Sequence, residues 1–182
     1  PDEEQAVLGW FRVEYLPYRR WQARHGDDQS REKVRDHGRT FACWYLKRYP
    51  QWLLAPDWLS FQQAARLREN AQDKLVFCVL LDGLPAWDAE DFAHAISARI
   101  ERLQLQQRSY CFAPVPTVTE FAKDALLKGV PPKMAPEYLP LGTILRDNAS
   151  PKHELSNLQP GQLVFWRIGQ PDAAYHFEAN AK

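Results

Sequence analysis

An unbroken run of seven apolar residues extends from Leu75 to Leu81, and an aspartate and a glycine then end it. A short run of this kind, rich in valine and leucine, is typical of a β-strand that is buried on both faces under helices. Its length and its abrupt Asp-Gly end favour a strand over a short buried helix. Apolar segments at 109–113 and 163–168 predict two further strands of the same sheet.

Other segments carry apolar residues at helical spacing, as Val7, Phe11 and Tyr15 do near the start of the chain. The expected helices cover residues 4–24, 31–48, 57–69, 88–103 and 119–128, with a short one near 143–146. Pro17 should kink or split the first of them, because proline lacks the N–H that a helix interior requires. The order strand, helix, strand from residue 75 to residue 113 favours a right-handed parallel β-α-β unit.

Capping residues and an apolar stripe support several of these boundaries. Ser30, Asp57 and Asp88 precede helical segments and are expected N-caps. Gly129, followed by two prolines, is expected to end the helix over 119–128. In the helix over 88–103, the residues expected to form the buried stripe are Phe92, Ile96, Ile100 and Leu103.

These elements predict an α/β protein with a mostly parallel sheet flanked by helices, preceded by a helical N-terminal region. We place the helical region at residues 1–72 and the α/β domain at 73–182. The helical region is rich in tryptophan, tyrosine and arginine. Its aromatic stripes are interpreted as core, with a docking surface for a partner as the alternative.

Composition narrows the function only a little. The 182 residues are enough for one domain with a small appendage, and 23 basic residues balance 23 acidic ones. The basic residues between Arg19 and Arg39 fit a solvated helix face or a nucleic-acid surface. Three cysteines without a CxxC pair, no secretory leader and no apolar segment of about 20 residues indicate a cytoplasmic protein outside the membrane.

Polar groups suited to metal chemistry follow the predicted strands. Asp82 follows the first strand, Thr119 begins a helix after the second, and Asp172 and His176 follow the third. Parallel strands would bring these groups to one edge of the sheet, where α/β proteins bind ligands. Carboxylate and imidazole suit zinc or manganese, and a hydroxyl beside such an ion can become a nucleophile. This pattern predicts metal-assisted transfer of a phosphoryl or sulfuryl group.

Each of these residues also has a simpler interpretation. Asp82 can belong to an Asp-Gly turn after any strand, Thr119 can be an N-cap, and His176 can be a surface residue. It is the order of the set along the chain that favours the catalytic interpretation.

Three segments resemble the alkaline phosphatase superfamily, and within it the PglZ domain of BREX-type bacterial phage-defence systems. Residues 79–84 resemble the first metal-ligand strand of the superfamily. Residues 116–129 resemble the Pro-Thr-x-Thr nucleophile segment of its nucleotide pyrophosphatase branch, with a glycine ten residues after the second threonine. Residues 170–176 resemble the Glu-Pro-Asp-x-x-Gly-His ligand segment of that branch. The Thr-Glu-Phe after the prolines and the aromatic-rich helical lead-in point to PglZ.

The resemblance implies two metal sites and a threonine nucleophile. Asp82 and Thr119 would belong to one metal, and Asp172 and His176 to the other. The ions would be divalent, with zinc expected and manganese as the alternative. The intact protein would then hydrolyse phosphate esters, including phosphodiesters of nucleic acid, alongside other defence-system proteins.

Two departures from the family pattern matter. Ala122 stands where the branch often has an asparagine that steadies the transferred group, and Lys123 beside it is not an obvious substitute. The later Asp-His pair and final histidine of the superfamily find no match after His176, and Asp36–His37 precedes the first strand. We therefore expect this chain to be the N-terminal part of a longer protein, with a half-built and weakly active or inactive site.

Two rival interpretations remain open. The fold could serve as a non-catalytic interaction module of a defence complex that docks a partner protein or DNA through its helical N-terminal region. Alternatively, the chain could be a generic α/β domain in which the three motifs coincide by chance.

Overall fold

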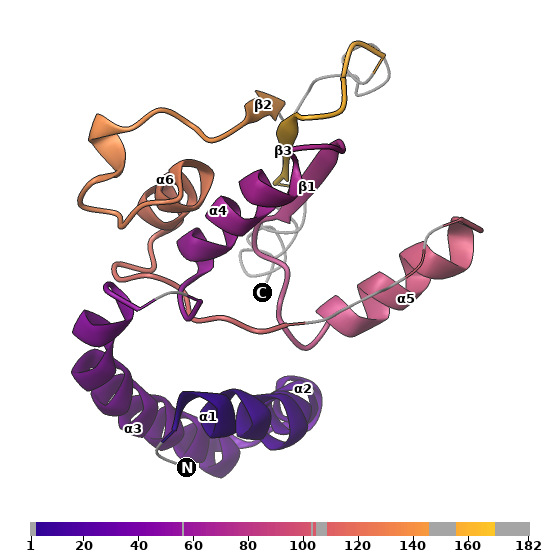
Figure 1. Ribbon diagram of the computed structural model, residues 1–182. Coiled ribbons are helices and arrows are strands. Elements are labelled where there is room, and N and C mark those ends of the chain that lie inside the picture. Colours follow the sequence, from indigo (N-terminus) through magenta and orange to yellow (C-terminus); the bar gives the residue numbers. More distant parts are fainter. Residues whose placement is uncertain (1–2, 56, 103, 105–108, 146–155, 170–182) are drawn as a thin grey trace. The chain divides into compact units, whose positions relative to one another are not determined.

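The computed structural model describes residues 3–55, 57–102, 104, 109–145 and 156–169 (Figure 1). The chain divides into two compact units, one of residues 1–55 and 85–111 and the other of residues 56–84 and 112–182. These units differ from the division expected at residue 72, since the helix expected over 57–69 groups with the sheet and the helix expected over 88–103 groups with the N-terminal helices. Among the described residues, no helix is both long and apolar enough to cross a membrane.

The first unit is helical. Its elements are α1 (Glu4–Trp10), a π-helical stretch (Phe11–Tyr15), α2 (Leu16–His25), α3 (Asp28–Trp52) and α5 (Ala89–Arg99). The first three form one continuous helical run, which confirms the helix expected over residues 4–24. Pro17 lies just after the π-helical stretch instead of breaking the run. A wider turn of this kind is a common way to accommodate an interruption of the α-helical hydrogen bonds.

α3 is longer than expected and has a different N-cap. Asp27 is the cap, and its Oδ1 accepts a hydrogen bond of 2.8 Å from the backbone N–H of Ser30. The expected cap at Ser30 is therefore wrong, because the aspartate three residues earlier takes that role. The helix continues through Pro50 to Trp52, beyond the end expected at residue 48.

α1 packs against the end of α3 through Trp52, whose side chain is 1% exposed. Its indole Nε1–H donates a 3.0 Å hydrogen bond to Oε1 of Glu4, and the Arg48 guanidinium lies 3.6 Å from the same oxygen. α5 belongs to this unit through the ion pair between Arg20 and Asp91.

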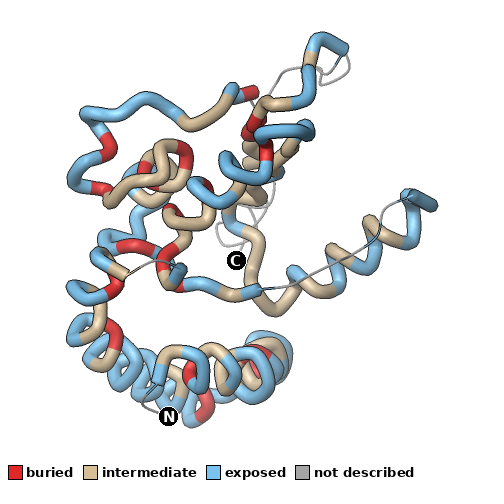
Figure 2. The backbone as a smooth tube through the Cα atoms, viewed as in Figure 1, coloured by how far each residue is buried: buried red, intermediate tan, exposed pale blue. Residues whose placement is uncertain are grey.

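The described part of the apolar stripe expected on α5 is not buried, and Leu103, its last member, lies outside the described residues. Figure 2 shows no buried residue on this helix, and Phe92 and Ile100 are 37% and 52% exposed. Asp88 does occupy the N-cap position, although its side chain makes no capping hydrogen bond. The expectation failed because helical spacing shows which residues share a face but not whether anything covers that face.

The second unit is α/β, which confirms the expected class. Its elements are α4 (Ser60–Asn70), β1 (Val76–Leu81), α6 (Thr119–Lys128), a 3-10 helix (Ala135–Glu137), β2 (Thr143–Leu145) and β3 (Leu163–Ile168). The strands form a parallel sheet of order β1-β3-β2, with Val76 opposite Leu163 and Thr143 opposite Val164. β1 and β3 thus form where the sequence predicted strands.

Three expectations about strands and helix starts are wrong. Residues 109–113 add no strand to the sheet, because their one pairing is an isolated bridge between Phe112 and Leu59. The helix expected near residues 143–146 is instead β2 over 143–145. Asp57 does not cap α4; the cap residue is Leu59, whose N–H donates a 2.8 Å hydrogen bond to Oε1 of Gln62.

The core of this unit lies between the sheet and helices α4 and α6, which pack beside each other (Figure 1). Its members are Ala64, Ala71, Leu127, Leu163 and Phe165, with Val76, Cys78 and Leu80 of β1 packed against them. The other side chains of β1 are less covered, and Val79 is 42% exposed. The expected burial of this strand on both faces is wrong: the described core packs against the face with Val76, Cys78 and Leu80, and no residue of β1 is fully buried.

Candidate functional site

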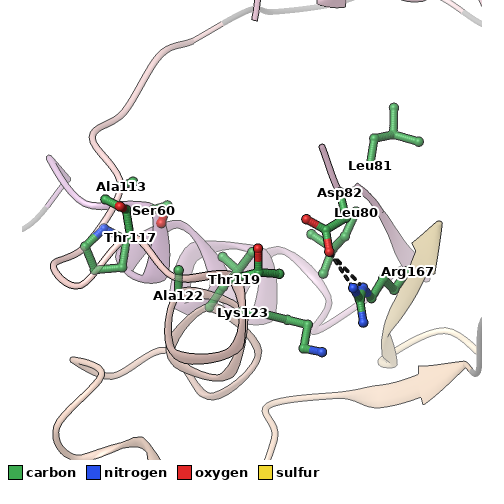
Figure 3. A pocket seen from close by; sticks show the side chains of 12 residues that line it. Ser60, Leu80, Leu81, Asp82, Ala113, Thr117, Thr119, Ala122, Lys123 and Arg167 are labelled. Atoms are coloured by element: carbon green, nitrogen blue, oxygen red, sulfur yellow. Dashed lines mark hydrogen bonds and ion pairs between the residues drawn. The ribbon is translucent and has the colours of Figure 1, made fainter. Parts of the chain in front are cut away.

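A cavity of about 290 Å³ lies in the second unit, where β1 ends beside α6 (Figure 3). Strand ends, the start of α4, the segment before α6 and one face of α6 all contribute to it. The lining residues are Ser60, Leu80, Leu81, Asp82, Ala113, Pro114, Thr117, Thr119, Ala122, Lys123, Leu126 and Arg167. Two residues predicted for the site, Asp82 and Thr119, therefore line the same cavity.

The register of the sheet explains how Asp82 and Arg167 meet. Leu80 lies opposite Arg167 in the parallel pair, and alternate residues of a strand share a face. Arg167 therefore continues the β3 face that carries Leu163 and Phe165. Asp82, two residues after Leu80, continues the corresponding face of β1 beyond the strand end.

The two side chains form a forked ion pair. Nε and Nη2 of Arg167 donate hydrogen bonds of 3.1 and 2.5 Å to Oδ2 of Asp82. The backbone N–H of Asp82 donates a further bond of 3.1 Å to the carbonyl of Ile168. The side chain of Asp82 is 18% exposed and that of Arg167 is 31% exposed, so the carboxylate is held in place at the cavity wall.

α6 presents one side to the cavity. Thr119, Ala122, Lys123 and Leu126 all line it, and their spacing of three, four and seven residues places them on one helix face. Val118 is the N-cap, and no side chain caps the helix by a hydrogen bond. The interpretation of Thr119 as an N-cap is therefore wrong: it is the first helical residue, and it borders the cavity.

α6 ends as predicted. Gly129 adopts the left-handed conformation at φ 70°, and its N–H bonds the carbonyls of Ala125 and Leu126. A glycine is favoured here because it has no Cβ to clash in that conformation. Both ends of the helix that carries Thr119 are therefore set by local sequence.

Of the four residues predicted to bind metal, the structure describes only Asp82 and Thr119. Asp172 and His176 lie outside the described residues. Among the described residues that line the cavity, Asp82 is the one acid, and no group of three His, Cys, Asp or Glu residues in the described ranges could hold a metal. The Asp82 carboxylate and the Thr119 hydroxyl are oxygen donors of a suitable kind, but they fall short of the four ligands that zinc usually takes.

Asp36 and His37, the other Asp-His pair, lie in α3 of the first unit. His37 Nδ1 is 2.8 Å from the carbonyl of Lys33, and Asp36 lies 3.5 Å from Nη1 of Arg39. Both residues are exposed. They are thus engaged with neighbours on their own helix, as expected for a solvated helical stretch.

Sequence reasoning missed Arg167 and left Lys123 without a role. The available signal for Arg167 is a charge inside the apolar run 163–168, which is unusual in a strand of a parallel sheet. The signal for Lys123 is its position four residues after Thr119, which places it one turn further along the same helix face.

Comparison of the chain with protein-family models, with curated proteins and with solved structures finds no match.

Proposed function

We propose that this chain is part of a divalent-metal-dependent phosphoesterase or phosphodiesterase of the PglZ type, acting in bacterial anti-phage defence with Thr119 as the nucleophile. The observation that carries the proposal is the cavity that Asp82 and Thr119 line together. The alkaline-phosphatase-like fold is part of the same proposal. Its support is the parallel pairing of β1 with β3, which places Asp82 at the carboxyl edge of the sheet.

In this mechanism the Thr119 oxygen attacks the phosphorus of a phosphate ester. The new O–P bond forms as the bond to the leaving alkoxide or aryloxide breaks, and water later releases the phosphoryl group from Thr119. Asp82 and Thr119 would contribute to one metal site, with Asp172 and His176 contributing to the other. A divalent ion held there would lower the pKa of the attacking hydroxyl, whose proton would pass to solvent, and would neutralise charge on the phosphoryl oxygens. Arg167 holds the Asp82 carboxylate in a fixed orientation.

The test is hydrolysis of an aryl phosphodiester by the intact protein supplied with zinc or manganese. Thr119→Ala should lower kcat at least about a thousandfold, because the attacking atom is removed. Thr143→Ala is the matched control, since Thr143 lies exposed in β2 and does not line the cavity. Activity that is unchanged by Thr119→Ala would exclude the nucleophile role.

A second candidate function is a non-catalytic interaction module that docks a defence-system protein or DNA through the helical N-terminal region. It is favoured by an open groove of about 600 Å³ in the first unit, whose lining includes Trp10, Phe41 and Trp44. This function predicts that Trp10→Ala with Phe41→Ala abolishes partner binding while the intact protein contains no metal by elemental analysis. Phe92→Ala, an exposed aromatic position outside the groove, is the control.

A further inference from the structure

Lys123 is a half-buried residue that forms no ion pair with the described residues. It lines the cavity, and no ion pair or hydrogen bond involves its ammonium group there. Lys128 on the same helix shows the usual arrangement, with its Nζ 2.8 Å from Oδ2 of Asp124 and 2.7 Å from the carbonyl of Ala135. A lysine that lines a cavity and forms no ion pair there can bind an anion from outside the chain.

Among the described charged residues that line the cavity, Lys123 is the one whose charge is not balanced by an ion pair. Arg167 is neutralised by Asp82, and the remaining described lining residues are apolar or carry hydroxyl groups. Figure 3 shows the Lys123 side chain extending from α6 on the side of the Asp82–Arg167 pair. Apolar walls such as Leu80 and Leu126 lower the local dielectric constant, which strengthens the attraction of Lys123 for an anion.

A second hollow borders Lys123 on the far side of the Thr119 face. Glu120, Asp124 and Lys133 also line that hollow. Asp124 is paired with Lys128, but the Glu120 carboxylate there would repel an anion, whereas the cavity beside Asp82 has its one described carboxylate paired with Arg167. The cavity is therefore the side on which an anion would bind.

We propose that Lys123 binds the non-bridging oxygens of the phosphoryl group that Thr119 attacks, and so makes this cavity a phosphoryl-anion site. This inference rests on the proposed function for the identity of the anion as substrate. Four residues of helix advance about 6 Å along the axis, and the lysine side chain is long enough to reach oxygens on a phosphorus atom beside the Thr119 hydroxyl. Lys123 is thereby a substrate-binding residue.

The test measures inorganic phosphate binding to the metal-free intact protein by isothermal titration calorimetry in EDTA at low salt. Lys123→Met should weaken phosphate binding about tenfold or more, because a charge-assisted hydrogen bond is lost, whereas Lys123→Arg should keep most of it. Lys74→Met is the matched control: Lys74 is exposed and lies two residues before β1, at the end of the strand away from Asp82. Unchanged binding in Lys123→Met, or an equal loss in Lys74→Met, would overturn the proposal.

Hydrolysis distinguishes failure of this inference from failure of the proposed function. Thr119→Ala should keep phosphate binding in EDTA and lose turnover of the aryl phosphodiester, while Lys123→Met should also raise KM for that substrate. If turnover depends on Thr119 but phosphate binding does not change in Lys123→Met, the role of Lys123 is overturned and the proposed function stands. Phosphate binding that depends on Lys123, without turnover by the metal-loaded protein, would overturn the proposed function and support the anion site.

Discussion

Gly129 and Gly38 differ in what an added methyl group would meet. Gly129 has a φ of +70°, and a Cβ there would lie 2.6 Å from Cδ1 of Leu141. Gly38 lies inside α3, where a Cβ would have no atom within 4 Å. The same substitution should therefore have opposite effects at the two positions.

Gly129→Ala should lower the free energy of unfolding by about 1–2 kcal/mol, because a left-handed residue with a side chain is strained. Gly38→Ala should raise it by about 0.5–1 kcal/mol, because alanine is the better helix former. Urea denaturation followed by circular dichroism checks both changes, and each variant serves as the control for the other. Destabilisation by both substitutions would contradict the expected open space at Gly38.

At the scale of single residues, the sequence was sufficient to place Asp82 at a strand end and Thr119 at a helix start, while their roles as metal ligand and nucleophile stay predictions. A carboxylate at the end of an apolar run and a hydroxyl at a helix start are both readable from local pattern. Arg167 was not readable, because its role depends on the register of two strands and its partner Asp82 lies 85 residues away. Asp172 and His176 stay predictions, since both lie outside the described residues.

At the scale of elements, prediction succeeded where the local signal was long or well bounded. The runs over β1 and β3 and the helix from Thr119 to Lys128 agree with the structure within a residue or so. Prediction failed at 109–113 and 143–145, which are short segments whose structure depends on partners distant in the sequence. Tertiary pairing decides such segments more than their own propensity does.

Glu4 links α1 to α3, and its contribution should depend on pH. The hydrogen bond from the Trp52 indole, followed by a backbone hydrogen bond and the charge of Arg48, lowers the pKa of the Glu4 carboxyl, and burial opposes this only in part. A carboxyl with a lowered pKa in the folded state stabilises that state at neutral pH. In the unfolded chain the glutamate pKa is about 4.3. The stabilisation is lost as the pH falls from that value through the lower pKa of the folded state.

Glu4→Ala should therefore destabilise the first unit by about 1–3 kcal/mol at neutral pH, because the buried Trp52 N–H loses its acceptor. The cost should shrink as the pH falls below about 4. Hydrogen exchange of α1 amides at both pH values measures this. Glu3→Ala is the matched control, since Glu3 is exposed and its side chain makes no capping hydrogen bond.

At the scale of the whole molecule, the two compact units should respond differently to an anion. The cavity belongs wholly to the second unit. Phosphate at ten times its dissociation constant should stabilise that unit by about 1.4 kcal/mol. Hydrogen exchange should then slow about tenfold in α6 and β1 and remain unchanged in α1, α2 and α3. Equal slowing in both units would indicate non-specific binding of phosphate instead.

The position of β3 in the sheet also has a consequence for protein synthesis. β3 comes last of the described strands yet lies between β1 and β2, so neither of the other two has this sheet partner until residues 163–168 have left the ribosome. Until then β1 presents an apolar segment with unpaired backbone groups, which is the kind of nascent segment that aggregates or recruits chaperones. Arg167 lies in the same strand, so the ion pair with Asp82 that forms part of the cavity wall can form only after β3 has been synthesised and has paired with β1.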